Sequence, residues 1–215
     1  MLVYPNRRSF RQLYSKYCRN VLLNKSSNNS ESETIVIISY YDTIANIRNV
    51  LKRIGIDLGS ELRKMSIIIM DSVTAYSYSK LEERLWVSRN NSENGSPFEK
   101  RNKGFCEDTN NSLASFPILY RPYRILTLLG SLMRSTRESG ITGLCVIADM
   151  GSFYLLNKIE ELVDYESSYN PKFDMDVKVK AFCCHHRQEI KRTLTVEQRD
   201  RIFSHHNRNL LLLSS

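Results

Sequence analysis

A single stretch, residues 141–166, most constrains what this chain can fold into. It begins with the uninterrupted apolar run Leu144–Ala148, which ends on Asp149. An apolar run without alternation is typical of a strand buried on both faces. After a short turn, apolar side chains recur over Phe153–Val163 at the three- and four-residue spacing of one helix face. The stretch therefore predicts a strand, a loop and one helix, with a carboxylate at the carboxyl end of the strand.

Strand and helix patterns alternate along the rest of the chain. Further strands are predicted at residues 2–4, 35–41, 65–70, 177–184 and 210–213. Further helices are predicted at residues 9–23, 44–54, 122–139 and 195–205, the last opened by a capping box. This alternation indicates a three-layer α/β fold with a mostly parallel sheet and helices on both faces. Because apolar and basic residues alternate at 177–180, we expect the strand there at an edge of the sheet.

The length of 215 residues indicates a single domain, spanning 1–215. Residues 88–115 are rich in Asn, Ser and charges and carry no helix or strand pattern, which favours a disordered insertion. No apolar run approaches the ~20 residues of a membrane span. There is no signal-peptide layout, and the five cysteines lack the spacing of a disulfide framework. We therefore expect a cytoplasmic protein with reduced thiols and no membrane partner.

The net charge of +8 leaves two interpretations open. Scattered basic residues are typical of a solvated surface, but they also favour acidic partners. Tyrosines interleaved with the basic residues near the N-terminus would suit single-stranded nucleic acid. Tyr14 and Tyr17, however, recur at the spacing of a buried helix face. Nucleic-acid binding is therefore an alternative and not the first hypothesis.

Two predicted strands end on carboxylates, Asp71 and Asp149. A phosphate-binding ATPase holds its magnesium-linked acid in this way, although Asp also follows strands because it caps the next helix. Such an enzyme needs a glycine-rich loop after its first strand. Here the turn contains Pro5, which has no N–H, and no glycine. ATP hydrolysis is therefore disfavoured, whereas Arg7 and Arg8 could still contact an anion at the helix N-terminus.

Soft ligand atoms occur at two places, in Cys183–His186 and in His205–His206. Adjacent residues of a strand face opposite ways, so only one member of each pair can serve one site. No Cys-x-x-Cys motif is present, and no metal is assigned. Cys183, His185 and His205 are kept as candidate ligands. A Cys–His nucleophilic dyad is less favoured, because no third orienting group is evident.

Several short motifs occur in an order that matches a known family. They are Tyr4 with Phe10, Gly55–Leu58, Ile68–Tyr76, Gly143–Phe153 with Tyr165–Glu166, and Cys183 with His205 or His206. In these motifs the chain resembles the MEDS domain (methanogen/methylotroph, DcmR sensory domain), a relative of the RecA/KaiC-type ATPases. The resemblance implies a sensory module of signalling or transcription control, RecA-like in fold but with a degenerate phosphate loop. The chain departs from the family in carrying Cys183–His186 where the family tends to have Cys-x-Tyr-Asp.

We therefore expect a non-catalytic sensory domain that binds a small anionic ligand, with a nucleotide as candidate, at the carboxyl edge of the sheet. The expected ligand contacts are Arg7, Arg8, Asp71, Tyr76, Asp149, Met150, Gly151 and Glu166. The output would pass to a protein signalling partner or to a homo-oligomer. The alternatives are a RecA-like enzyme that hydrolyses ATP with an atypical phosphate loop, and a nucleic-acid-binding protein.

Overall fold

A computed structural model of the chain describes residues 1–23, 33–78, 119–120, 129–130, 143–168, 178–206 and 208–212. The main strands are β1 (Leu2–Tyr4), β2 (Glu33–Ser39), β3 (Ile67–Asp71), β6 (Gly143–Asp149), β7 (Lys178–His186) and β8 (Leu210–Leu211). The helices are α1 (Arg7–Leu23), α2 (Ile44–Arg53), α3 (Leu58–Arg63), α4 (Ser72–Tyr76), α7 (Gly151–Leu155), α8 (Ile159–Ser168), α9 (Arg187–Thr193) and α10 (Val196–His205). The predicted insertion at 88–115 and nearly all of the predicted helix at 122–139 lie outside the described residues.

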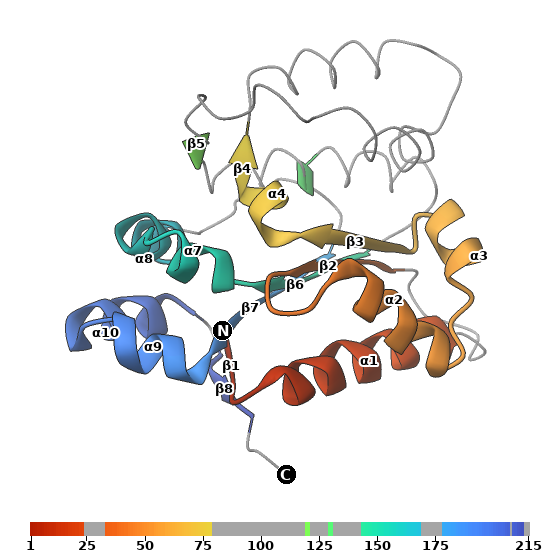
Figure 1. Cartoon of the computed structure of the whole chain (residues 1–215), viewed down its shortest axis with the longest axis horizontal. Helices are drawn as coiled ribbons and strands as arrows, with labels where there is room; N and C mark the ends of the chain where they lie inside the picture. Colours follow the sequence, from red (N-terminus) through yellow and green to blue (C-terminus); the bar gives the residue numbers. More distant parts are fainter. Residues whose placement is uncertain are drawn as a thin grey trace, which may run out of the picture.

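The six main strands form one sheet in the order β3-β2-β6-β7-β1-β8, and every pair is parallel (Figure 1). Two short strands, β4 (Ser77–Tyr78) and β5 (Leu119–Tyr120), pair antiparallel in a separate ribbon. The predicted α/β fold with a mostly parallel sheet is confirmed. Because all strands of the main sheet run the same way, their carboxyl ends meet at a single edge.

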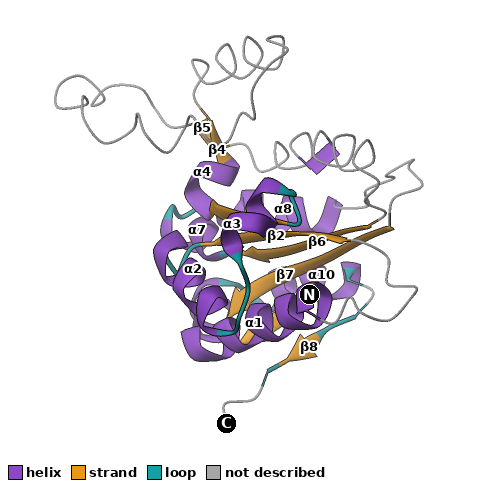
Figure 2. Ribbon diagram, turned by 90° about the vertical axis from the view of Figure 1, so that its right-hand side faces the viewer, coloured by secondary structure: helices purple, strands orange, loops and turns teal. Residues whose placement is uncertain are grey.

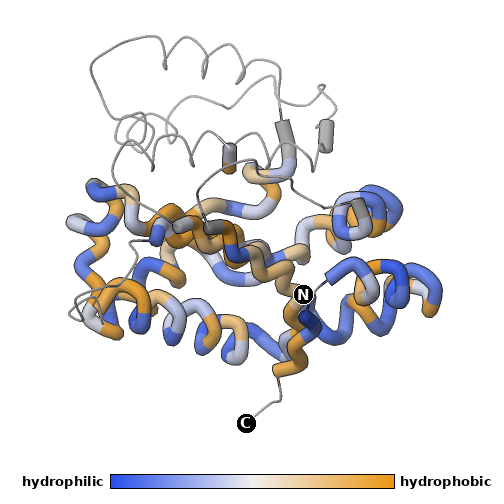
Figure 3. The backbone as a smooth tube through the Cα atoms, turned by 180° about the vertical axis from the view of Figure 1, so that it is seen from behind, coloured by the Kyte–Doolittle hydropathy of each residue, from blue (hydrophilic) through white to orange (hydrophobic). Residues whose placement is uncertain are grey.

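Helices cover both faces of the sheet, so the core has two halves (Figure 2). In β2, Ile35 and Ile37 pack with the helices α1, α2 and α3, whereas Val36 and Ile38 pack with α4, α7, α8, α9 and α10. Figure 3 shows the strands between the two layers as a hydrophobic centre. The continuous apolar runs of the sequence therefore reflect burial on both faces. Among the described residues, no helix combines the length and apolarity needed to cross a membrane.

One predicted helix start is confirmed by its capping contacts. The capping box that opens α10 is present, with the Thr195 side chain accepting from Gln198 N and the Gln198 side chain accepting from Thr195 N. Gly55, which follows the end of α2, has φ +91°, a conformation that glycine adopts without strain.

The prediction of one helix over Phe153–Val163 is wrong, because the segment forms the two helices α7 and α8. Asn157 lies between them with φ +52°. Lys158 N donates to Phe153 O over 2.8 Å, and Asn157 N donates to Tyr154 O over 3.2 Å. These two bonds form a Schellman motif, and Asn is the side chain that most readily replaces glycine in its left-handed position.

The prediction that β7 is an edge strand is also wrong, because β7 lies between β6 and β1. The alternation of apolar and basic residues that suggested an edge arises because the strands differ in length. β1 has three residues and pairs only with Cys184–His186, whereas β6 pairs with β7 from Lys178 onward. The alternating segment of β7 therefore has one strand neighbour among the described residues, and Lys180 extends to an ion pair with Glu33.

Candidate functional site

Asp149, at the carboxyl end of β6, is completely buried and receives four hydrogen bonds from the protein itself. Tyr4 Oη donates to Oδ1 over 3.1 Å, and Gly151 N donates to Oδ1 over 3.0 Å. Tyr40 N and Tyr41 N donate to Oδ2 over 3.1 and 3.0 Å. Burial raises the pKa of Asp149, and these four bonds act in the opposite direction. The carboxylate therefore ties β1, the turn after β2 and the start of α7 to the end of β6.

The surroundings of Asp149 are closely packed with aromatic rings. A Cβ atom added to Gly151 would lie 2.5 Å from Tyr40 Cδ1 and 2.6 Å from Tyr41 Cε2. The ring of His186 lies 5.4 Å from the ring of Tyr4 and 5.3 Å from that of Tyr41, between ring centroids. Aromatic side chains thus pack closely around Gly151 and Tyr4, two of the residues that donate to Asp149.

The other expected ligand contacts lie in separate environments. Arg7 and Arg8 are exposed in the first turn of α1, whose N-terminus is capped by Asn6 Oδ1 accepting from Ser9 N over 3.0 Å. Asp71 caps α4, because its Oδ1 accepts from Thr74 N over 2.9 Å. The carboxylate of Asp71, although it lies at the end of a strand, therefore serves as the cap of the following helix.

Tyr76 and Met150, also expected ligand contacts, are completely buried in the core. The hydroxyl of Tyr76 donates to the sulfur of Met150 over 3.7 Å, and the ring of Tyr76 lies 5.0 Å from that of Phe153. Both side chains thus pack beneath the carboxyl edge and belong to the core that surrounds α4 and α7.

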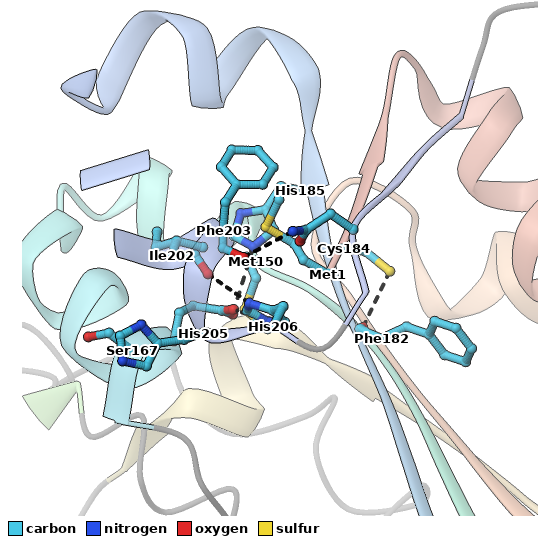
Figure 4. Close-up of polar contacts among 12 residues, drawn as sticks. Met1, Met150, Ser167, Phe182, Cys184, His185, Ile202, Phe203, His205 and His206 are labelled. Carbon is cyan, nitrogen blue, oxygen red and sulfur yellow. Dashed lines mark hydrogen bonds and ion pairs between the residues drawn. The ribbon is translucent and has the colours of Figure 1, made fainter. Parts of the chain in front are cut away.

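Glu166, the remaining expected contact, lies at the centre of a buried group of metal-ligating side chains. Its carboxylate faces Cys183 and His185 of β7 and His206, which follows α10. His206 Nε2 lies 2.9 Å from Glu166 Oε2, and His185 Nε2 lies 3.7 Å from Oε1. Figure 4 shows His185 and His206 on this side of β7. We call these four residues the Glu166 cluster.

The strand geometry explains why Cys183 and His185 belong to the cluster. Residues two apart on a strand share a face, so Cys183 and His185 both face α8 and α10. Cys184 faces the opposite half of the core, with Cys145 and Ile147. The prediction that only one of the two adjacent cysteines can serve a site is therefore consistent with the packing of β7.

His206, and not the predicted candidate His205, is the histidine that reaches Glu166. His205 is exposed, and its Nδ1 lies 2.8 Å from Arg201 O. The sequence contained a signal for His206, because the apolar Ile202 lies four residues earlier. In the structure Ile202 is buried. Residues four apart lie on the same helix face, which extends the inward face of α10 to position 206.

The cluster contains buried polar atoms without directed hydrogen bonds. When His206 is neutral, both carboxylate oxygens of Glu166 and the Nε2 atom of His185 have no hydrogen-bond partner among the described residues. The other ring nitrogens are occupied: His206 Nδ1 lies 2.9 Å from Ile202 O, and His185 Nδ1 lies 2.9 Å from Tyr154 Oη. Since a carbonyl only accepts, His206 Nδ1 carries a proton. A His206 that is also protonated at Nε2 donates to Glu166 Oε2 over 2.9 Å, whereas a neutral His206 presents an Nε2 lone pair to the carboxylate.

Glu166 is a buried anion, and Cys183 is a buried neutral thiol. Burial alone would raise the pKa of Glu166, but its interactions with His185 and His206 outweigh burial and lower the pKa to about 2. Burial raises the pKa of the Cys183 thiol well above its ordinary value, and the charge of Glu166 raises it further. The cluster thus combines one negative charge, one thiol and two imidazoles, with no ion-pair partner from Lys or Arg among the described residues.

Comparison of the sequence with models of known protein families and with curated proteins gives no match. The two buried carboxylates differ in what compensates them. Asp149 accepts four hydrogen bonds from donors whose protons are fixed, whereas the compensation of Glu166 depends on the protonation of His185 and His206.

Proposed function

We propose that this chain is a non-catalytic sensory domain whose ligand binds at the Glu166 cluster. The observation that carries the proposal is the fully buried Glu166 carboxylate, whose only charge partners among the described residues are the imidazoles of His185 and His206. These histidines compensate the charge only while one of them is protonated, and with both neutral the buried charge would cost on the order of 3–5 kcal/mol. A ligand that binds between Glu166 and the two histidines would offset this cost.

The position of the cluster suits a domain that responds to its ligand. Its side chains come from β7, α8 and the end of α10, and α8 and α10 are in contact. A ligand held by all three segments favours their closed arrangement, and the stability of the domain then rises with ligand concentration. The change would reach a protein signalling partner or a second copy of the chain through the outer surfaces of α8 and α10.

Charge narrows the class of ligand. Glu166 repels anions, and the exposed Arg7 and Arg8 lie at the start of α1, on a different element from the cluster. A cation or a hydrogen-bond donor therefore fits the Glu166 cluster better than the small anion or nucleotide expected from the sequence. The resemblance to MEDS domains supports the sensory role, and the packing around Asp149 supports a role without ATP hydrolysis.

The test is native mass spectrometry of freshly purified protein, followed by thermal unfolding with divalent cations, small amines and nucleotides. Wild-type protein should retain a ligand or unfold at a higher temperature with a cation or an amine. Glu166→Gln should lose that response, because it removes the charge while keeping the shape of the side chain. The proposal is wrong if no compound of any class stabilises the wild type, or if Glu166→Gln responds as strongly as the wild type.

A further inference from the structure

We infer that the Glu166 cluster is a zinc site in which Glu166, Cys183 and His206 are ligands. His185 lies outside the group of atoms that are all within 4.8 Å of one another, but its Nε2 is 3.7 Å from Glu166 Oε1, and it would become the fourth ligand by a small shift toward the ion. The inference rests on the proposed function and deepens it, because it assigns the ligand. One ligand atom each from Glu166, Cys183 and His206 can be chosen so that all three lie within 4.8 Å of one another. Sulfur, imidazole nitrogen and carboxylate oxygen are the three donor types that bind Zn²⁺ in proteins.

The spacing of these atoms suits one small ion. Zinc–ligand bonds are about 2.0–2.3 Å long, so that ligand atoms on one ion lie roughly 3–4 Å apart. The 2.9 Å between His206 Nε2 and Glu166 Oε2 and the 3.7 Å between His185 Nε2 and Glu166 Oε1 already fall near this range. The ligands come from the strand β7, from α8 and from the residue that directly follows α10.

The second ring nitrogen of each histidine is held as zinc proteins require. A histidine that binds a metal through Nε2 typically donates its Nδ1 hydrogen to a carbonyl or another polar group, which sets the tautomer. Ile202 O accepts from His206 in this way, and Tyr154 Oη lies 2.9 Å from His185 Nδ1. The Nε2 lone pair of a neutral His206 is then left for the ion. The hydroxyl of Tyr154 can donate or accept, so His185 offers its Nε2 lone pair in the tautomer whose Nδ1 donates to Tyr154.

The charges balance when a divalent ion binds. Zinc ligation replaces the proton of the Cys183 thiol, which leaves to solvent as the S–Zn bond forms. One thiolate and one carboxylate then neutralise the two positive charges of Zn²⁺. Without a metal, the group must instead rely on a protonated histidine beside Glu166. The metal-free site then contains no thiolate, so detection of a thiolate distinguishes the zinc-bound site from the metal-free one.

The experiment measures metal binding to full-length protein that has been stripped with a chelator. We expect one equivalent of Zn²⁺ by elemental mass spectrometry, and a thiolate-to-cobalt charge-transfer band when Co²⁺ replaces it. Cys183→Ser should abolish the band, and His206→Gln should weaken zinc binding by about tenfold or more. The neighbours supply matched controls: Cys184→Ser and His205→Gln should bind zinc as the wild type does, because Cys184 faces the other half of the core and His205 is exposed.

A measurement on the wild type covers the case in which Cys183→Ser does not fold. Zinc should protect Cys183 from alkylation in partly denaturing conditions, with the modified cysteine identified by fragment-ion mass spectrometry. Absence of both the cobalt band and this protection would overturn the zinc site. If an amine still stabilises the wild type through Glu166, the sensory proposal stands without zinc. If no compound does so, both fail.

Discussion

The hydroxyl of Tyr4 donates a hydrogen bond of 3.1 Å to Oδ1 of Asp149 and so connects β1 to β6 across the intervening strand β7. β1 has only three residues, and this bond anchors its carboxyl end. The same carboxylate binds the backbone of the turn after β2. Asp149 therefore acts as a structural junction for the carboxyl edge of the sheet.

Tyr4→Phe should lower the free energy of unfolding by about 1–3 kcal/mol, because it leaves the buried Asp149 charge with one donor fewer. The measurement is urea unfolding at neutral pH. Tyr40→Phe is the matched control, since Tyr40 contributes only its backbone N–H to Asp149 and the substitution keeps it. Equal losses in the two variants would show that the Tyr4 hydroxyl has no special role.

Gly151→Ala should destabilise the domain by about 1–3 kcal/mol, because the new methyl group would overlap the Tyr40 and Tyr41 rings. Thermal unfolding measures the loss. Combined with Tyr40→Ala, which removes one of the two rings, Gly151→Ala should cost less than in the wild-type background. Strict additivity in this double-mutant cycle would mean that the ring of Tyr40 moves away freely.

The strands could be predicted from the sequence because their signal is local. Unbroken β-branched runs such as Ile35–Ile38 mark strands buried on both faces wherever they lie in the sheet. The order of the strands could not be predicted, because it depends on pairing between distant segments. β7 illustrates the difference: its lysine alternation suggested an edge, but β1 pairs with its carboxyl end, with Leu2 opposite Cys184, a residue far away in the sequence.

The candidate site was only partly predictable for a similar reason. Glu166, Cys183 and His185 were each identified singly as candidates, but nothing in the sequence brings α8 to β7. The role of Asp149 depended on the backbone of Tyr40 and Tyr41, and backbone donors leave no trace in residue identity. Residue types therefore indicated which polar side chains are candidates for a site. Tertiary packing determines which of these side chains come together and which bind only to the protein backbone.

Asn157→Gly should leave the stability of the domain nearly unchanged or raise it slightly, because glycine adopts φ +52° without strain. Asn157→Val should cost about 1–2 kcal/mol, since a β-branched residue fits this conformation poorly. Thermal unfolding of the two variants tests the Schellman motif between α7 and α8. A valine variant as stable as the glycine variant would argue for one continuous helix instead.

Asp42 should make the stability of the domain depend on pH in the acid range. Burial alone would raise the pKa of Asp42, but the bonds from Arg11 and Tyr14 outweigh it and hold the pKa below its ordinary value. A depressed carboxyl pKa stabilises the fold above the unfolded pKa of ~3.9, and this contribution is lost as the pH falls through the folded pKa.

Urea unfolding of Asp42→Asn across the acid range measures this contribution. The variant should be about 1–2 kcal/mol less stable than the wild type near neutral pH, a value discounted because Arg11 is 38% exposed. The difference should shrink at pH values below about 4. Asp164→Asn is the control, since Asp164 and Arg201 are both more than half exposed and their pair should contribute under about 1 kcal/mol. A difference that stays constant with pH would contradict the assignment.

Magnesium-ATP should not raise the unfolding temperature of the protein. A nucleotide would need backbone donors in the turn after β1, where Pro5 has none, and a free carboxylate at the end of β6, where Asp149 already binds four donors. Thermal unfolding with and without magnesium-ATP tests this, with Arg7→Gln and Arg8→Gln as variants that remove the exposed cations at the helix start. A rise in unfolding temperature that Arg7→Gln and Arg8→Gln abolish would show anion binding at α1, and ATP turnover that Asp149→Asn abolishes would restore the RecA-like enzyme.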